Sequence, residues 1–248
     1  MKHLPSLTAV FVHYYKHDQL IENVSKLVNA LFAFECQIIV VDNSKPADFE
    51  QFHELLDQIN LSGRHSLTVI NSEKNCRFRA YNKGLLAALN DYIVFRSDDD
   101  DFDEMIIRRE LLSIASAPLQ KRPDLLVFEY LYDSRSFAHR RPERPIETLM
   151  ISRDAFLTSG FVPERDSGDW TYLARVFDLF EGQFRRQVLM NKAPHGRSVN
   201  AVDDLSNDVS AMTLDPLSIS EGDYATDLSG REYILEDNYA GSRFLPCA

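Results

Sequence analysis

Four consecutive aspartates, Asp98 to Asp101, directly follow a short apolar segment at residues 92–95. Adjacent carboxylates repel one another, so such a run costs stability unless a cation neutralises it. Mg²⁺ and Mn²⁺ favour oxygen ligands, and ions of this kind often bridge phosphate groups. The run therefore indicates a divalent-cation site. A solvated acidic turn, with Asp99 or Asp101 as the N-cap of the next helix, has the same composition and is the alternative.

The apolar segment belongs to a series of strands that alternate with helices. Strand patterns occur at residues 7–12, 37–41, 67–70 and 92–95, and helical periodicity occurs at 18–34, 49–59 and 80–89. This alternation predicts an α/β fold with a mostly parallel sheet and helices on both faces. Ligands of such sheets bind beyond the carboxyl ends of the strands. The polar loops at 13–15, 42–44, 71–79 and 97–101 should therefore converge on one crevice.

The pattern changes after the acidic run. Helices are expected at 105–115, 152–159 and 167–180, and strands at 125–131 and 184–190. The second of these helices has Ser152 as its predicted N-cap and Gly160 as its predicted stop. Residues 203–248 are polar, acidic and weakly periodic, which indicates an irregular tail. The change of pattern near residue 102 indicates two halves with different roles inside one compact domain.

Composition excludes several function classes. The chain has 248 residues, 44% of them hydrophobic, which is enough for a substantial core. A net charge of −11 argues against a general binder of nucleic acid. Three cysteines without metal-type spacing favour a reducing compartment. We see neither the pattern of a signal peptide nor the roughly 20 apolar residues of a membrane span. A cytoplasmic protein is expected, peripheral to a membrane only through partners.

Several short motifs occur in a characteristic order. A strand leads into residues 12–16, a second strand ends in Asp-Asn-Ser at residues 42–44, and a third ends in the acidic run. Asn75, Ala80, Asn82, Gly84 and Leu85 have a fixed spacing, Gly-Asp-Trp stands at 168–170, and His195 precedes Ser198 and Val199. Over roughly residues 7–200, this order resembles the family 2 glycosyltransferases, which are inverting enzymes of the GT-A fold with an Asp-x-Asp motif.

The chain departs from the family pattern at three positions. Arg77 stands where the family usually has Gly, and Tyr81 replaces the usual Arg. Ser97 occupies the place of the first Asp of Asp-x-Asp, with Asp99 as the second. The metal pair could instead be Asp98 with Asp100, or Asp99 with Asp101.

The resemblance implies a GT-A-like (Rossmann-like) domain at residues 1–202, with a nucleotide-sugar-binding half at 1–101 and an acceptor-binding half at 102–202. It implies a metal-dependent, inverting glycosyltransferase that moves a sugar from a nucleoside diphosphate sugar. UDP is the commonest donor nucleotide in the family, so a UDP-sugar is expected. The acceptor is expected to be a glycan, a lipid-linked sugar or a polysaccharide precursor.

The same resemblance assigns the metal and the catalytic base. Mn²⁺ or Mg²⁺ would be held by Asp99 with Asp100 or Asp101, and His195 would be a third ligand or a diphosphate contact. Asp169 is the candidate general base beside the acceptor hydroxyl, with Asp166 as the fallback. A simple cap of the following helix is the alternative role for Asp169.

Donor contacts are expected on the crevice loops. Asp42 would contact the base or ribose, or else form an ordinary Asx turn. Tyr14 would stack near the nucleobase or pack in the core. Arg77 and Arg79 would grip the diphosphate through charge-assisted bonds. The remaining candidate donor contacts in these loops are Asn43, Asn82 and Asp98.

Two alternatives come from other classes. A nucleotidyltransferase of related fold usually has a Gly-rich loop after the first strand, and residues 13–16 contain no Gly. A non-catalytic nucleotide-sugar-binding homologue would be consistent with Ser97 and Arg77 at positions where the family has other residues.

Overall fold

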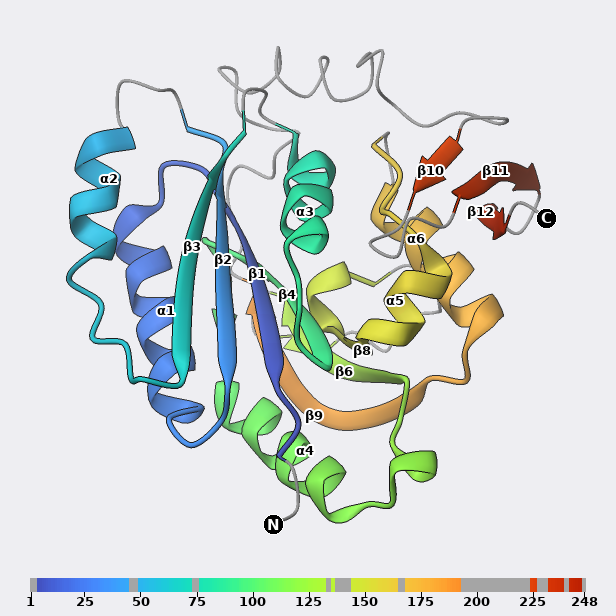
Figure 1. The fold of residues 1–248 in the computed structure, drawn as a ribbon, viewed down its shortest axis with the longest axis horizontal. Coiled ribbons are helices and arrows are strands. Elements are labelled where there is room, and N and C mark those ends of the chain that lie inside the picture. The colour runs from blue at the N-terminus through green and yellow to red at the C-terminus, as the bar shows by residue number, and fades with distance from the viewer. Residues whose placement is uncertain are drawn as a thin grey trace.

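The structure is a computed structural model that describes residues 4–44, 49–72, 76–132, 135–136, 144–164, 168–192, 224–226, 232–238 and 241–246. Among these residues, nine strands form one curled sheet with helices on both faces. Figure 1 shows α1 and α2 against one side of the first strands and α3, α5 and α6 on the other side. His195, Ser198, Val199, Asn75 and Asp166 lie outside the described residues.

The first half of the chain forms the parallel part of the sheet. Its elements are β1 (Leu7–His13), α1 (His17–Ala30), β2 (Cys36–Asp42), α2 (Phe49–Leu56), β3 (His65–Asn71), α3 (Arg77–Leu86) and β4 (Tyr92–Ser97). The strands are ordered β3-β2-β1-β4, and all neighbours in this set are parallel. The expected alternation and the α/β fold class are confirmed.

The second half continues the sheet with mixed pairing. It contains β5 (Asp101–Phe102), α4 (Glu104–Ser116), η2 (Leu119–Lys121), β6 (Leu125–Tyr132), β7 (Arg135–Ser136), η3 (Ile146–Thr148), β8 (Leu149–Ser152), α5 (Arg153–Ser159), α6 (Gly168–Leu179) and β9 (Gln183–Lys192). The sequence did not predict β8. This strand lies between β4 and β6 and is antiparallel to both, so it joins the two halves of the sheet.

Alternate residues of the central strands enter two different cores. Ala9, Phe11 and Val94 pack with helices α1 and α4, whereas Val10, Ile93 and Phe95 pack with α3, α5 and α6. This period of two explains why the strands are apolar on both faces. Gly84 lets α3 approach β1 closely, because a Cβ at this position would clash with the side chain of Val10. The predicted caps of α5 are also present, since Ser152 accepts from the amide of Ala155 and Gly160 has φ 74°.

One ion pair is fully buried at the end of β4. Arg96 donates from Nε and Nη2 to the two carboxylate oxygens of Glu104, both at 2.8 Å, and from Nη1 to the carbonyl of Phe95. Its guanidinium also lies 4.5 Å from the centroid of the Phe102 ring. Because Glu104 begins α4, the pair fixes this helix against the strand that carries the acidic run.

Within the segment 203–248, the described residues form an antiparallel sheet of three strands, β10 (Tyr224–Thr226), β11 (Glu232–Asn238) and β12 (Gly241–Pro246). The sequence had indicated irregular structure there. Across the described part of the chain, none of the helices combines the length and apolar character needed to cross a bilayer.

Replacing Arg96 by Met should lower the free energy of unfolding by about 3–5 kcal/mol, because Glu104 would remain buried without its counter-charge. Denaturant unfolding followed by circular dichroism measures the change. Lys26→Ala is the control, since Lys26 pairs with Asp101 and Glu22 at the surface and its loss should cost about 1 kcal/mol or less. Equal effects of the two substitutions would contradict this role for the buried pair.

Candidate active site

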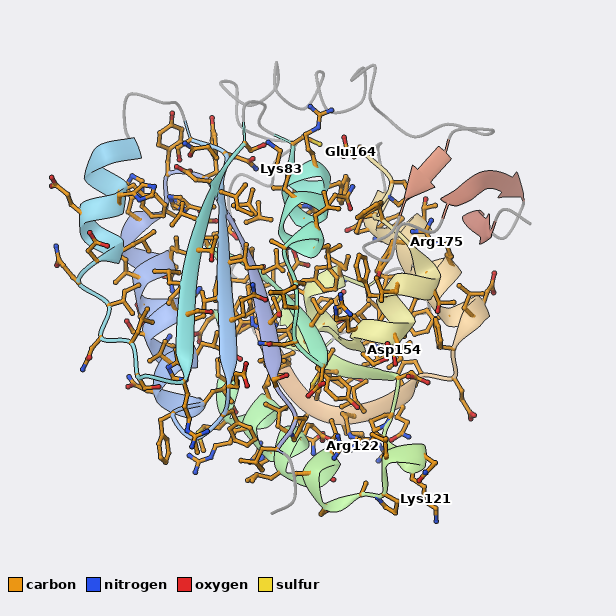
Figure 2. All side chains as sticks on the ribbon, in the orientation of Figure 1. Lys83, Lys121, Arg122, Asp154, Glu164 and Arg175 are labelled. Carbon is orange, nitrogen blue, oxygen red and sulfur yellow. The ribbon has the colours of Figure 1, made fainter. Side chains whose placement is uncertain are left out.

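The loops at the carboxyl ends of β1, β2 and β3 are joined by backbone hydrogen bonds. The amide of Asn43 donates to the carbonyl of His13 at 2.9 Å, and the amide of Ser72 donates to the carbonyl of Asp42 at 2.8 Å. The predicted convergence of these loops on one edge of the sheet is therefore present. Figure 2 shows Lys83 and Glu164 at this end of the molecule and Lys121 and Arg122 at the opposite end.

Asp98 holds the loop that follows β1. Its Oδ2 accepts from the amide of Tyr14 at 2.6 Å and lies 2.8 Å from Nδ1 of His13. His13 is buried, stacks on Phe52 and meets Nδ1 of His17 at 2.8 Å through its other nitrogen. Asp98 thus fixes the backbone of the first crevice loop, and its contact with a donor stays a prediction.

The first crevice loop also presents two aromatic rings. Tyr14 is half-buried, and its ring meets that of Tyr15 edge-on with the centroids 4.6 Å apart. Tyr15 has φ 59°, a left-handed conformation that non-glycine residues adopt rarely. An aromatic surface at the edge of the crevice suits the predicted stacking role of Tyr14.

Asp42 is buried with one of its carboxylate oxygens unused. Oδ1 accepts from the amide of Ser44 at 2.8 Å, which is the expected Asx turn. Among the described residues, neither Oδ2 of Asp42 nor Oδ1 of Asn43 has a hydrogen-bond partner. Unpaired buried acceptors are costly. A ligand with N–H or O–H donors would satisfy them, so the turn and the ligand contact are compatible.

The acidic run is divided among different partners. Asp100 is fully buried, and its Oδ2 accepts from Ser97 Oγ at 2.7 Å and lies 3.8 Å from Lys192 Nζ. Asp101 is exposed and pairs with Lys26 at 2.7 Å. Asp99 is half-buried, and its charge acts on Arg77. The N-cap of α4 is Asp103, rather than Asp99 or Asp101 as the alternative interpretation had it.

The described residues test whether a metal ion would fit. Within them, no three His, Cys, Asp or Glu side chains gather in a way that could hold an ion. Mg²⁺, however, commonly keeps several waters and binds through one or two carboxylates together with substrate phosphates. Asp99 in the crevice suits a site of that kind, completed by the substrate.

Asp169 lies in the first turn of α6 and meets Arg77 from the first turn of α3. Arg77 Nη2 donates to Asp169 Oδ2 at 3.1 Å. Gly168 lets the start of α6 pack against Pro163, because a Cβ at this position would clash with the carbonyl of Pro163. The candidate base and one candidate diphosphate ligand are therefore in direct contact.

The neighbouring residues of α3 bind the segment that leads to α6. Arg79 Nε donates to Glu164 Oε2 at 2.9 Å. The amide side chain of Asn82 donates to the carbonyl of Val162 at 2.8 Å and accepts from its amide at 2.9 Å. Asn82 thus connects the two halves of the crevice, and the donor roles of Arg79 and Asn82 stay predictions.

The sequence analysis missed one buried carboxylate, whose charge acts on both Asp169 and Arg77. Glu147 in η3 is 1% exposed, and its Oε1 accepts from the hydroxyl of Tyr81 at 2.6 Å. In the described part of the chain, no donor reaches its Oε2. Tyr81, already noted as a departure from the family pattern, is the side chain that fixes Glu147.

These charges set the protonation of the site. Burial raises the pKa of Asp169 above the ordinary range for a carboxyl group, Arg77 opposes the shift, and Glu147 adds to it. Burial works against the charge on Arg77, but Asp169, Glu147 and Asp99 outweigh it, so the pKa of the guanidinium is raised. A carboxyl group with a raised pKa in a crevice suits a general base.

The fold is shared by nucleotide-sugar transferases of the GT-A class. TarS 1–349 from S. aureus in complex with UDP superposes with a TM-score of 0.59 at 12% identity, covering 84% of this chain and 65% of that one. The mannosyltransferase PcManGT from Pyrobaculum calidifontis, in complex with GDP-Man and Mn²⁺, gives 0.59 at 13% identity with 80% and 60% covered. Glucosyl-3-phosphoglycerate synthase from Mycobacterium tuberculosis, in complex with Mg²⁺ and UDP, gives 0.56 at 14% identity with 85% and 79% covered.

The sequence itself matches the family described as Glycosyl transferase family 2 over residues 9–173. The chain belongs to this family, and the resemblance inferred from the motifs is confirmed. A search of curated proteins found no match. The chain spans about two thirds of the length of the TarS fragment, 65%.

Replacing Glu147 by Gln should lower the pKa of Asp169, because one of the negative charges that raise it would be removed. The pKa can be followed by ¹³C NMR of the aspartate carboxyl carbons, with Asp169→Asn used to assign the signal. Glu164→Gln is the matched control, since Glu164 pairs with Arg79 instead of Arg77. A signal of Asp169 that titrates as in the wild type would contradict the influence of Glu147.

Proposed function

We propose that this protein is a metal-dependent, inverting glycosyltransferase that uses a nucleoside diphosphate sugar, with UDP-sugars as the first candidates. The observation that carries the proposal is the contact of Asp169, a buried carboxyl with a raised pKa, with Arg77, whose other anionic neighbours include Asp99. Family membership and the UDP, UDP-GlcNAc and GDP-Man complexes of similar folds support it.

The donor nucleotide would lie across the loops after β1 and β2. Among the described residues no group donates to the buried Oδ2 of Asp42, which can accept from a base N–H or a ribose hydroxyl. Tyr14 offers an aromatic ring on the loop after β1. These residues would fix the nucleotide so that its diphosphate points towards Asp99 and the start of α3.

The start of α3 suits an anion. The partial positive charge at a helix N-terminus favours negative groups, yet the first turn of α3 has no acidic residue and contains Arg77 and Arg79. Two guanidinium groups at such a position can form charge-assisted bonds with the oxygens of a diphosphate. Their carboxylate partners, Asp169 and Glu164, balance this charge within the protein.

A Mg²⁺ or Mn²⁺ ion would be held by Asp99 with a neighbouring carboxylate of the acidic run, and His195 is the proposed third ligand. Such an ion supplies positive charge that stabilises a leaving diphosphate. Asp99 is half-buried and its charge acts on Arg77, which supports it as the principal protein ligand.

Asp169 would act on the acceptor. Its carboxylate takes the proton of the acceptor hydroxyl while that oxygen forms a bond to the anomeric carbon. The bond from this carbon to the diphosphate breaks, and its electron pair leaves with the diphosphate. Displacement in one step inverts the configuration. The acceptor is proposed to be a glycan or a lipid-linked precursor of a polysaccharide, bound by residues 102–202, with the donor bound by residues 1–101.

Replacing Asp99 by Ala should remove the part of donor affinity that depends on the metal, because the ion would lose its principal carboxylate. Calorimetric titration with UDP, with and without Mn²⁺, measures this affinity. Asp154→Ala is the control: this carboxylate is exposed on α5, outside the acidic run, and its loss should change UDP affinity little. The assignment is wrong if Asp99→Ala binds UDP with the metal dependence of the wild type.

Replacing Asp169 by Asn should lower kcat by about 10²- to 10⁴-fold while donor affinity stays close to that of the wild type, because the amide cannot accept the proton. Release of the nucleoside diphosphate from a donor panel measures turnover. Asp178→Asn, at an exposed position of the same helix, should have wild-type kcat. Undiminished turnover of Asp169→Asn would place the base elsewhere.

A further inference from the structure

Two carboxylates of the protein bind the two arginines in the first turn of α3. Arg77 binds Asp169 at 3.1 Å, and Arg79 binds Glu164 at 2.9 Å. Glu164 lies before α6 and Asp169 lies in its first turn, and both bind guanidinium groups that a diphosphate would need. These carboxylates therefore bind guanidinium groups to which phosphate oxygens could also bind.

Arg77 can change partners more easily than the buried arginine of β4. Its side chain is 28% exposed and reaches Asp169 through one nitrogen, whereas Arg96 is fully buried and binds Glu104 through two. Among the described residues, Nε of Arg77 has no hydrogen-bond partner. The guanidinium thus keeps donor capacity that its present contact does not use.

Glu147 would stay in place if Arg77 moved to another anion. It is held by Tyr81 at 2.6 Å and is 1% exposed. If Arg77 turned to another anion, Asp169 would keep a fixed negative neighbour and lose its positive one. The other polar group that meets Asp169 is the amide of Trp170, which donates to Oδ1 at 3.0 Å.

We propose that the diphosphate of the donor takes Arg77 away from Asp169, so that the candidate base is released only when the donor is bound. A diphosphate carries more charge and more acceptor oxygens than one carboxylate, so it competes well for a guanidinium. Arg77 is the residue that stands where the family usually has Gly, so this coupling would belong to this chain. The inference rests on the proposed function, because it requires a nucleoside diphosphate in the crevice.

The released carboxylate would bind protons more tightly. Arg77 opposes protonation of Asp169, whereas burial and Glu147 favour it. Removing the guanidinium takes away the charge that lowers the pKa of Asp169, while burial and Glu147 continue to raise it, so a stronger base meets the acceptor. Before the donor arrives, the ion pair keeps the carboxylate occupied.

The test is the number of protons taken up when UDP binds. Calorimetric titrations with UDP and Mg²⁺, repeated with GDP, are performed at several pH values in pairs of buffers that differ in ionisation enthalpy. We expect the wild type to take up more protons per nucleotide than Asp169→Asn, by up to about one proton near the pKa of Asp169. Protons that belong to the nucleotide or the metal are the same in both proteins and cancel.

Two substitutions of Arg77 complete the test. Arg77→Gln and Arg77→Lys should bind the nucleotide more weakly and lose the extra proton uptake partly or fully, with Lys retaining more affinity than Gln. Arg109→Gln is the control, because Arg109 is exposed on α4 and should leave affinity and uptake unchanged. Circular dichroism verifies folding, and Arg77→Lys decides the question if Arg77→Gln does not fold.

The outcomes separate the two ideas. If neither UDP nor GDP binds, the proposed function falls and the inference falls with it. If a nucleotide binds and Asp169→Asn takes up as many protons as the wild type, the inference alone is overturned. Full extra uptake in the Arg77 variants would overturn it in the same way.

Discussion

Mutual repulsion among the carboxylates after β4 is the constraint on which the crevice depends. Four negative charges at one strand end cannot share a direction, and the structure assigns them different surroundings. Asp98 holds the loop after β1, Asp100 turns to Ser97, and Asp101 pairs with Lys26 on α1. The separated carboxylates thereby connect the end of β4 to the loop after β1 and to α1. Asp99 is half-buried, and its negative charge acts on Arg77, the arginine that also binds Asp169.

The described arginines of the crevice region show two ways of placing a cation next to an anion. Arg96 and Glu104 form two parallel hydrogen bonds in a dry environment, and this pair fixes α4 to the sheet. Arg77 and Asp169 share a single bond at the edge of the crevice. The first geometry has little freedom because both partners would be buried alone if they separated. The second leaves room for exchange with a ligand.

Much of the fold followed from periodicity. Strands β1 to β4 and their helices were predicted because each is apolar over a length that matches its type, and the caps of α5 at Ser152 and Gly160 were visible in the sequence. Strand β8 was missed because four residues that run straight into a helix carry almost no alternation.

The site was predicted in part. The positions of Asp42 and Asp99 at strand ends, and of Asp169 at the start of a helix, followed from periodicity and motif order. The different partners of the four aspartates could not be predicted, because Tyr14 and Lys26 come near the acidic run only in the folded chain. Glu147 gave no signal either. Its partner Tyr81 lies 66 positions away, and a single glutamate two positions after a proline resembles a loop residue in the sequence.

The position of β8 has a consequence for the order in which the molecule is assembled. This strand pairs with Tyr92 to Val94 on one side and with Leu125 to Val127 on the other, so it is made long after β4 and after β6. While the ribosome is still adding residues before 149, β1 to β4 can already be paired, but β6 has no neighbour to connect it to them. Such an edge is prone to wrong pairing. The gap between β4 and β6 can therefore close only after residues 149–152 have left the ribosome.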